Sequence, residues 1–502
     1  MKKILIANRG EIAVRVIRAC RDMGIATAAV YSECDRAALH VRMADEAWPV
    51  GPSAPRESYL RIDAIIDAAR RAGADAVHPG YGFLAENEDF AAACRDSGII
   101  FIGPTPEAIA LMGSKTAARQ SAIAAGVPVV PGTEQPLAED TPDADVLAVA
   151  TAIGYPLMLK AVAGGGGKGM RMVASPVDLP GALRAARSEA QSAFGDGAVY
   201  LERRITAPRH IEVQLLGDHH GTVVPFVERE CSIQRRHQKV LEESPSPVVS
   251  ADLRRRLTAA AAAVAARVGY TNAGTIEFLL DEDGSFYFLE MNTRLQVEHP
   301  ITEMVTGVDL VQWQIRIARG ERLDLDPAVR LTPNAHAIEC RIYAEDPENG
   351  FLPSPGRIQG LRVPQGPGVR DDSGAYEGGE VPIFYDPMIS KLITWGDSRA
   401  HAIQRMRRAL AEYQVRGVRT TIPFFQWILD DEDFKAARFD TTFIDRKLGA
   451  NGSGRLNPLE PPHEDLAAIT AAVHLFTRPV PNGHQPAAAS RWRQAARMDA
   501  LR

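Results

Sequence analysis

Short apolar runs alternate with amphipathic stretches over the first hundred residues, and this alternation constrains the fold more than any other feature of the chain. Apolar residues at every third or fourth position favour helices, whereas compact apolar runs favour buried strands. Strands separated by helices predict a parallel sheet, and therefore an α/β fold for this region. On these criteria we expect strands at 3–7, 27–31, 76–78 and 98–103, and helices at 11–23 and 62–72.

Composition and the first turn exclude several classes of protein. The turn Asn8-Arg9-Gly10-Glu11 lacks the G-x-G-x-x-G pattern of a dinucleotide site, which disfavours a nicotinamide cofactor. The net charge of −6 disfavours a nucleic-acid partner, which would need a basic surface. No apolar run is long enough to span a membrane, and the first apolar stretch ends at Asn8, too early for a signal peptide. Five widely spaced cysteines without CxxC spacing predict reduced thiols in the cytoplasm.

The 502 residues suffice for roughly three domains, and the character of the sequence changes along them. From about Lys115 the sequence contains hairpin-like strands, a glycine run and dense charged motifs. From about Pro333 to Gly449 it has strand-like pieces, Gly and Pro turns, and a predicted helix at 399–412. The tail from Ala450 is rich in Pro, Ala and Asn, which indicates a linker followed by a helix near 488–501.

A glycine run joins two predicted strands at 155–163 and 170–174. Glycines at 164–167 let backbone amides approach an anion closely, and Lys160 and Lys168 add positive charge. The run is not a Walker A loop, because Gly169 rather than Ser or Thr follows Lys168. A solvated surface hairpin is the simplest interpretation, and a lid over a triphosphate is the functional one.

Two glutamates are predicted to face each other across a hairpin. The strands 275–280 and 285–292 flank Asp283-Gly284, a strong two-residue turn signal. Placing Glu282 opposite Ser285 sets Glu277 opposite Glu290, with their Cβ atoms about 5 Å apart. Because opposed carboxylates among apolar neighbours repel, a Mg²⁺ or Mn²⁺ ion between them is favoured over a solvated polar face.

Polar residues continue in alternation after Glu290, as Asn292, Arg294, Gln296 and Glu298. If the segment is extended, one face presents two amides, a guanidinium and a carboxylate, which suits a small planar anion beside a base. An ordinary two-faced strand is the alternative. The dense cluster at 228–239 mixes acids with bases, which argues against a nucleic-acid patch and leaves a substrate-anion site or a solvated face.

Taken together, these segments resemble biotin carboxylase, a member of the ATP-grasp superfamily, over about residues 3–449. The resemblance implies an N-terminal Rossmann-like domain (1–114), an ATP-grasp domain (115–332, with a mobile lid at about 132–204), a C-terminal biotin carboxylase domain (333–449) and a tail (450–502). The motifs that carry it are Ile6–Ala13, His78–Leu84, Gly164–Met170, Gln234–Lys239 and Glu290–Pro300.

The resemblance also implies roles for individual residues. Metal ligands would be Glu277, Glu290 and Asn292, in agreement with the hairpin count. Bicarbonate would contact Lys239, Arg294, Gln296 and Val297, with Glu298 as general base, and Arg341 would stabilise the biotin enolate. The expected ATP contacts, besides Glu277 and Glu290, are Lys115, Lys160, Gly166, Gly167, Glu202, Arg203, Ile205, His210, Gln234 and His237.

The implied reaction is ATP- and Mg²⁺-dependent carboxylation of biotin by bicarbonate through carboxyphosphate. These 502 residues lack the Met-Lys-Met biotinylation motif, so we expect biotin on a separate biotin carboxyl carrier protein, and a second partner in the form of a carboxyltransferase subunit. The expected enzyme is a cytoplasmic homodimer in an acyl-CoA carboxylase, acetyl-CoA being favoured for fatty acid biosynthesis. Pro367 replaces an aromatic residue common at a dimer contact in relatives, which weakens the dimer expectation. The alternatives are a pyruvate carboxylase component, another ATP-grasp carboxylate ligase, and a scaffold with a degenerate site.

Overall fold

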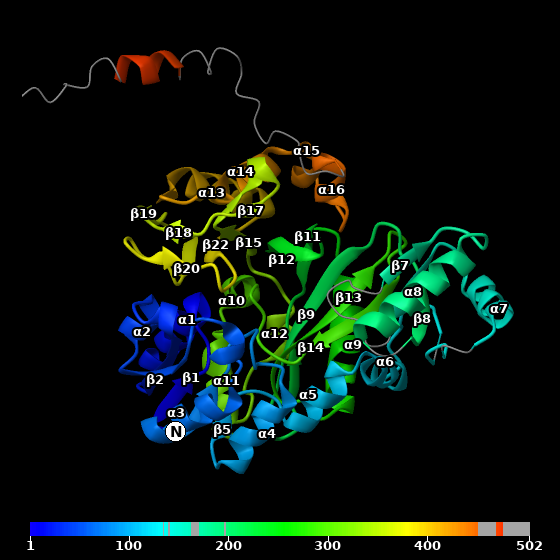
Figure 1. Cartoon of the computed structure of the whole chain (residues 1–502), viewed down its shortest axis with the longest axis horizontal. Coiled ribbons are helices and arrows are strands. Elements are labelled where there is room, and N and C mark those ends of the chain that lie inside the picture. The colour runs from blue at the N-terminus through cyan, green and yellow to red at the C-terminus, as the bar shows by residue number, and fades with distance from the viewer. Residues whose placement is uncertain (134, 139–140, 162–169, 195–196, 450–467, 475–502) are drawn as a thin grey trace, which may run out of the picture. The chain divides into compact units, whose positions relative to one another are not determined.

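The computed structural model describes residues 1–133, 135–138, 141–161, 170–194, 197–449 and 468–474. The chain divides into two compact units, Met1–Gly454 and Arg455–Arg502. In the second unit, residues 468–474 are helical and exposed. The helix expected near 488–501 lies outside the described residues. Figure 1 gives the arrangement of the first unit, which contains every sheet described below.

The N-terminal sheet confirms the predicted α/β arrangement. Its five strands are parallel in the order β3-β2-β1-β4-β5. The amphipathic stretch after β1 forms α1, whose apolar residues, such as Val16 and Ile17, are fully buried. The elements are β1 (Lys3–Ile6), α1 (Gly10–Asp22), β2 (Ala26–Ser32), α2 (Leu39–Met43), β3 (Glu46–Gly51), α3 (Ile62–Ala72), β4 (Ala76–His78), α4 (Glu88–Asp96) and β5 (Ile100–Phe101).

A nine-stranded sheet forms the centre of the unit and carries most of the predicted site. Eight strands run in the order β14-β13-β9-β11-β12-β15-β22-β20, and β10 pairs with β9. Because β12 pairs with β15, one sheet crosses residue 332, where the sequence changes character. The strands are β9 (Arg209–Gly217), β10 (Val223–Pro225), β11 (Arg229–Arg235), β12 (Gln238–Ser244), β13 (Asn272–Leu280), β14 (Phe286–Asn292), β15 (His336–Tyr343), β20 (Val369–Ser373) and β22 (Met388–Gly396).

A separate antiparallel sheet, β7-β6-β8, contains the strands on either side of the glycine run. The strands are β6 (Leu157–Ala161), β7 (Met170–Val173) and β8 (Val199–Arg203). β6 begins two residues later and β7 ends one residue earlier than the sequence predicts, and residues 162 and 163 of the first predicted strand lie outside the described residues. Helices α7 (Asp143–Ile153) and α8 (Leu179–Phe194) bury Val146 and Leu183 against this sheet. In Figure 1 these elements form the cyan and green group around α7, α8 and β7.

Further helices and short strands complete the first unit, and the predicted helix at 399–412 is present as α13. The helices are α5 (Pro106–Gly113), α6 (Lys115–Ala124), α9 (Ala251–Arg267), α10 (His299–Thr306), α11 (Leu310–Ala318), α12 (Pro327–Arg330), α13 (Arg399–Glu412), α14 (Ile422–Asp430), α15 (Glu432–Lys435) and α16 (Phe443–Leu448). The short strands pair as β16 (Glu345–Asp346) with β17 (Leu352–Pro353), β18 (Gly356–Arg357) with β21 (Glu380–Val381), and β19 (Gly360–Arg362) with β23 (Gln414–Arg416). Within the described residues, no helix is long and apolar enough to cross a membrane.

The hairpin of β13 and β14 differs from its prediction in the turn but not at the glutamates. The turn spans three residues rather than two, because the Asp281 amide donates to the Ser285 carbonyl at 2.8 Å. Gly284 takes the left-handed conformation (φ +82°) that such a turn favours. A register shift between Glu277 and Phe278 then offsets the extra turn residue. Glu277 therefore still pairs with Glu290, as the simpler count predicts.

Candidate active site

The ammonium group of Lys239, on β12, lies among three carboxylates from three different parts of the chain. Its Nζ is 2.7 Å from Glu277 Oε1 on β13 and 2.7 Å from Glu298 Oε1, and it also bonds Glu212 on β9. Burial alone would lower the lysine pKa, but the three carboxylates raise it well above its usual value. Lys239 is therefore positively charged, and it links the hairpin that carries Glu277 to the segment that carries Glu298.

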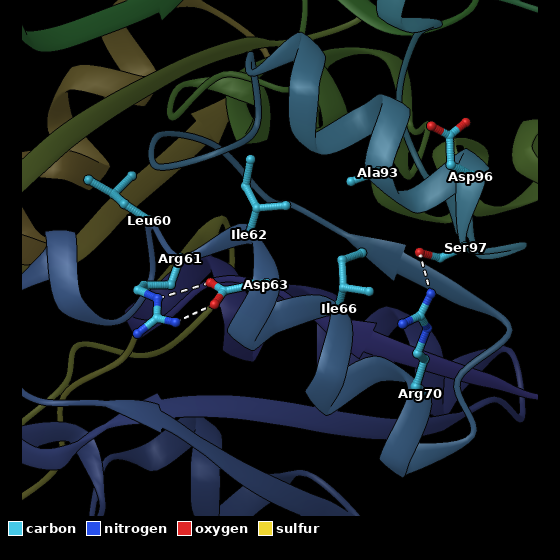
Figure 2. Close-up of a pocket in the computed structure, with 9 residues that line it drawn as sticks. All are labelled: Leu60, Arg61, Ile62, Asp63, Ile66, Arg70, Ala93, Asp96 and Ser97. Carbon is cyan, nitrogen blue, oxygen red and sulfur yellow. Dashed lines mark hydrogen bonds and ion pairs between the residues drawn. The ribbon is translucent and has the colours of Figure 1, made fainter.

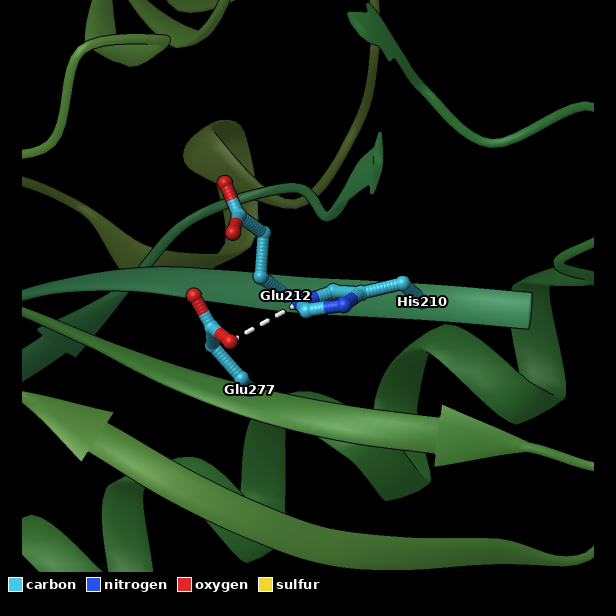
Figure 3. A group of neighbouring side chains, drawn as sticks. All are labelled: His210, Glu212 and Glu277. Carbon is cyan, nitrogen blue, oxygen red and sulfur yellow. Dashed lines mark ion pairs between the residues drawn. The ribbon is translucent and has the colours of Figure 1, made fainter. Parts of the chain in front are cut away.

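Glu277 receives donors from four residues. His210 Nε2 lies 2.9 Å from Glu277 Oε2, while Oε1 accepts from Lys239, from Asn292 at 2.9 Å and from Gln296 at 2.8 Å. Burial raises the Glu277 pKa, but Lys239 and His210 outweigh it and hold the pKa well below its usual value. Figure 3 shows His210 and Glu212 on one strand facing Glu277 on the neighbouring strand. The carboxylate is therefore ionised and fixed in orientation.

Glu290 differs from Glu277 in that its side chain is exposed and has no hydrogen-bond or ion-pair partner among the described residues. The surrounding protein and the neighbouring Glu277 raise its pKa. A divalent cation would relieve this repulsion, and two carboxylates with the Asn292 amide oxygen form the oxygen-rich ligand set that Mg²⁺ and Mn²⁺ prefer. In this structure Asn292 Oδ1 accepts from Arg294 at 3.0 Å.

The alternating polar row does not continue as a strand. β14 ends at Asn292, the following residues bend, and α10 begins at His299, so the expectation of an extended segment is wrong beyond Asn292. The bend still brings Gln296 to Glu277 and Glu298 to Lys239. Arg294 turns toward the N-terminal domain, where its Nε donates to Glu86 Oε2 at 2.6 Å. The backbone oxygen of Val297 accepts from Lys391 at 2.9 Å.

Arg341, on β15, connects Glu298 to a further buried acid. Its NH2 nitrogen is 2.9 Å from Glu298 Oε2 and 2.7 Å from Glu242 Oε1. Although burial raises the pKa of Glu298, Lys239, Arg341 and Arg229 together lower it below its usual value. Glu298 is thus ionised, and it lies between the lysine on one side and Arg341 on the other.

Arg229, on β11, is a site residue that motif reading did not single out. Its side chain is fully buried beneath the cluster. It pairs with Glu212, and its other bonds go to Gln296 at 2.7 Å, Gln214 and Thr302 at 2.9 Å, and Thr275 at 3.1 Å. Glu212, Glu86 and Glu242 were missed for the same reason: each is one charged residue without a motif. Strand pairing brings Glu212 and Glu242 to the cluster, whereas Glu86 reaches Arg294 from a turn of the N-terminal domain.

The residues expected at the nucleotide are distributed over two sheets. Gln234 Nε2 lies 3.0 Å from His210 Nδ1, and His237 is exposed in a tight β11–β12 turn where Arg236 and His237 both have positive φ. On the β6–β8 sheet, Lys160 donates to Glu202. Arg203 donates to the Tyr287 hydroxyl at 2.9 Å, Ile205 is buried, and Lys115 begins α6. Gly166 and Gly167 lie outside the described residues.

A separate surface depression of about 730 Å³ lies on the N-terminal domain between α3 and α4. Figure 2 shows its apolar side chains, including Ile62 and Ile66, beside the Arg61–Asp63 ion pair. None of the residues predicted for the site lines this depression. The chemistry-bearing residues gather instead on the central sheet, around Lys239.

Most of the cluster, including Lys239, Glu277 and Glu298 but not Arg341, lies in a region that matches a family model for an ATP-binding domain. Residues 114–326 match the ATP-binding domain of the carbamoyl-phosphate synthase L chain. The class of protein is therefore an ATP-grasp ligase. Residues 1–109 and 339–446 match the N-terminal and C-terminal domains of biotin carboxylase. The chain belongs to the biotin carboxylase family.

Individual relatives agree with this assignment. The chain is 56% identical to the biotin carboxylase of Nostoc sp. over 88% of this chain and 98% of the relative. It is 51% identical to a pyruvate carboxylase subunit of Methanothermobacter thermautotrophicus, over 94% and 98%. Among solved structures, the biotin carboxylase–beta-gamma-ATP complex of Campylobacter jejuni superposes with a TM-score of 0.84 at 47% identity, covering 89% and 98%. The biotin carboxylase domain dimer of Hydrogenobacter thermophilus 2-oxoglutarate carboxylase, bound to MgADP and bicarbonate, superposes with a TM-score of 0.83 at 47% identity, covering 90% and 99%.

Proposed function

We propose that this chain carboxylates biotin on a carrier protein, using ATP and bicarbonate through carboxyphosphate, with Glu298, Lys239 and Arg341 at the centre of the reaction. The observation that carries the proposal is the continuous contact chain from Glu277 through Lys239 and Glu298 to Arg341. It joins the acid expected to hold metal to the arginine expected to meet biotin, so both steps of the reaction can take place at one site.

In the proposed first step, Glu298 accepts the bicarbonate proton and bicarbonate attacks the γ-phosphorus of ATP, which breaks the bond to the bridging oxygen, releases ADP and forms carboxyphosphate. Lys239, Arg294, Gln296 and the Val297 backbone would hold the bicarbonate. Lys239 is well suited, because a charge fixed by neighbouring carboxylates needs no reorganisation as negative charge builds. Glu277, Glu290 and Asn292 would hold Mg²⁺ or Mn²⁺, which when bound neutralises charge on the phosphates.

The nucleotide itself would be held by residues of both sheets. His210 and Gln234 already contact each other beside Glu277, and Lys160 and Glu202 form a pair on the neighbouring sheet. We propose that Lys115, Lys160 and His237 contact phosphates or ribose and that Glu202, Arg203 and Ile205 line the adenine. We further propose that the backbone amides of Gly166 and Gly167, which lie outside the described residues, bind the phosphates.

In the proposed second step, carboxyphosphate breaks down to CO₂ and phosphate. The phosphate takes the N1′ proton of biotin, Arg341 stabilises the enolate oxygen, and N1′ attacks the carbon of CO₂ to form carboxybiotin. Arg341 suits the role because it is always charged and is oriented by two buried carboxylates. Exclusion of water would protect the carboxyphosphate during this step.

The test is ADP release by the purified chain with ATP, Mg²⁺, bicarbonate and free biotin. We expect release to depend on both bicarbonate and biotin, and Arg341→Ala to lose the biotin dependence while the dissociation constant for ATP changes less than about twofold. Arg362→Ala, an exposed arginine on β19, is the matched control. Normal biotin carboxylation by Arg341→Ala would exclude the assigned role.

Partners, compartment and domain boundaries complete the proposal. We infer two partners, a biotin carboxyl carrier protein and a carboxyltransferase, together with a homodimer in the cytoplasm and domains at 1–114, 115–332 and 333–449 followed by the tail. The dimeric state of the Hydrogenobacter relative supports the dimer. Light scattering of the purified chain tests it: a mass near twice 54.4 kDa is expected, and a monomer at micromolar concentration would exclude a stable dimer.

The final carboxyl acceptor has two candidates. Acetyl-CoA or another acyl-CoA is favoured by the similarity to dedicated biotin carboxylases. Pyruvate is favoured by a different observation, since the alignment with the Methanothermobacter pyruvate carboxylase component extends over 487 residues rather than 442. Identification of the carboxyltransferase that co-purifies with the chain would decide between them.

A further inference from the structure

Two glutamates lie directly opposite each other in the interior of the central sheet, behind the proposed biotin-side arginine. Glu242 on β12 and Glu339 on β15 are partners in the antiparallel register. Both side chains are fully buried. Directly opposed residues of this kind have Cβ atoms about 5 Å apart. The pair is distinct from Glu277 and Glu290, which lie on β13 and on β14 at the edge of the same sheet.

The two carboxyl groups have different surroundings. Glu242 Oε1 is 2.7 Å from Arg341 NH2, the same nitrogen that lies 2.9 Å from Glu298. Among the described residues, no carboxyl oxygen of either glutamate has a hydrogen-bond partner, and Glu339 also forms no ion pair. The cations that act on Glu339 are Lys391 on β22 and Arg341, which lies two residues further along β15. Glu242 therefore has a cationic partner in direct contact, and Glu339 does not.

Two buried carboxylates on directly opposed residues repel each other, so both stay ionised only where each has a cation. Burial raises the pKa of Glu242 to about 7, with Glu298 and Glu212 raising it further and Arg341 and Lys239 lowering it. Burial likewise raises the pKa of Glu339 well above its usual value, where Glu242 and Glu298 add to the effect and Lys391 and Arg341 oppose it. The contacts favour the proton on Glu339 and the charge on Glu242.

We propose that Glu242 and Glu339 form a buried carboxyl pair that holds a single proton, with neutral Glu339 supporting ionised Glu242 as the positioning residue for Arg341. The inference rests on the proposed role of Arg341 in biotin carboxylation. Its consequence concerns the moment when Glu298 accepts the bicarbonate proton. At that moment Glu298 loses its charge and its attraction for the guanidinium. Glu242 still binds the same NH2 nitrogen, so Arg341 stays aligned for the biotin step.

The division of roles predicts different behaviour for two isosteric variants. Glu339→Gln keeps the volume and the neutral charge of a protonated acid, so biotin-dependent turnover at pH 7 stays within about twofold of wild type. Glu242→Gln removes the charge that holds Arg341, so biotin-dependent kcat falls about tenfold or more while the ATP dissociation constant changes less than about twofold. Glu380→Gln, exposed on β21, is the matched control. The alkaline limit of biotin-dependent kcat moves upward in Glu339→Gln, because Glu339 can no longer ionise.

A second measurement does not depend on turnover. Infrared difference spectra of the full chain, recorded between neutral and alkaline pH, report the C=O stretch of protonated carboxyl groups. Subtracting the spectrum of Glu339→Gln from that of wild type separates Glu339 from other buried acids, such as Glu11, whose pKa is also raised. We expect a C=O band in this subtraction. Its absence would overturn the proposal even if the enzyme had another activity.

The two measurements separate failure of the pair from failure of the proposed function. If wild type shows no biotin-dependent ADP release, the proposed function fails, and the infrared band still decides the protonation of Glu339. If wild type is active and Glu242→Gln matches Glu380→Gln, the positioning role is wrong. Equal losses in Glu242→Gln and Glu339→Gln would contradict the unequal roles. Circular dichroism and thermal unfolding confirm that each variant is folded before it is compared.

Discussion

Replacement of Arg229 with methionine tests whether the acidic cluster is held in place from beneath. The guanidinium is fully buried and contacts five side chains, one of them its ion-pair partner Glu212. Methionine fills similar volume without donors, which leaves Glu212 with Lys239 as its remaining cation among the described residues. Removing one partner of a buried ion pair costs about 3–5 kcal/mol. We therefore expect the free energy of unfolding to fall by about that amount.

Urea unfolding followed by intrinsic fluorescence measures this change, with Arg255→Met as the control. Arg255 is exposed on α9 and pairs with the exposed Asp252, so its replacement should alter stability by less than about 0.5 kcal/mol. Because Arg229 also orients Gln296, the KM for bicarbonate should rise about tenfold in Arg229→Met. A shift in unfolding no larger than that of Arg255→Met would refute the argument that Arg229 supports the cluster.

Two further predictions concern glutamates of the nine-stranded sheet. Glu282→Gln, at an exposed position in the β13–β14 turn, is the control for both. Glu290→Gln removes one of the two opposed carboxylates, so Mn²⁺ binding measured by electron paramagnetic resonance should weaken at least about tenfold; unchanged binding would exclude Glu290 as a ligand. For Glu243, burial raises the pKa, but Arg399 and His336 outweigh it and lower the pKa to about 2. A carboxyl group whose pKa is lower in the folded than in the unfolded state stabilises the fold at pH values above its unfolded pKa, which is about 4.5. That contribution, about 3 kcal/mol, is lost as pH falls from about 4.5 to about 2. The unfolding temperature should therefore fall less steeply with decreasing pH in Glu243→Gln than in wild type. Equal slopes in the two proteins would contradict a contribution of the Glu243 pKa to stability.

The sequence predicts secondary structure best where the spacing of apolar residues within one segment determines the element. The strand and helix alternation before residue 103 and the strands flanking the glycine run follow from apolar spacing, and the structure contains them. The sequence predicts the pairing of Glu277 with Glu290 correctly, but from a two-residue turn that the structure does not have. A three-residue turn adds one residue to the loop and a register shift removes its effect, and neither is visible in the Asp283-Gly284 signal.

The site was less predictable because it depends on contacts between distant segments. The row after Asn292 was expected to lie on one face of a strand, but a bend and the start of α10 bring Gln296 and Glu298 to the same acids by another route. Arg229 and Glu242 carry no motif signal of their own, since a single charged residue in a strand is indistinguishable from a solvated one. Only the order of strands in the nine-stranded sheet places them beneath Lys239 and Arg341.

The most direct test of the central claim is detection of the product itself. Purified chain is incubated with ATP, Mg²⁺, ¹³C-labelled bicarbonate and free biotin, and the ¹³C NMR spectrum is recorded for the labelled carboxyl group of carboxybiotin. We predict that the signal appears with wild type, requires ATP, and is absent with Arg341→Ala. Hydrolysis of ATP without any labelled carboxybiotin would contradict the account.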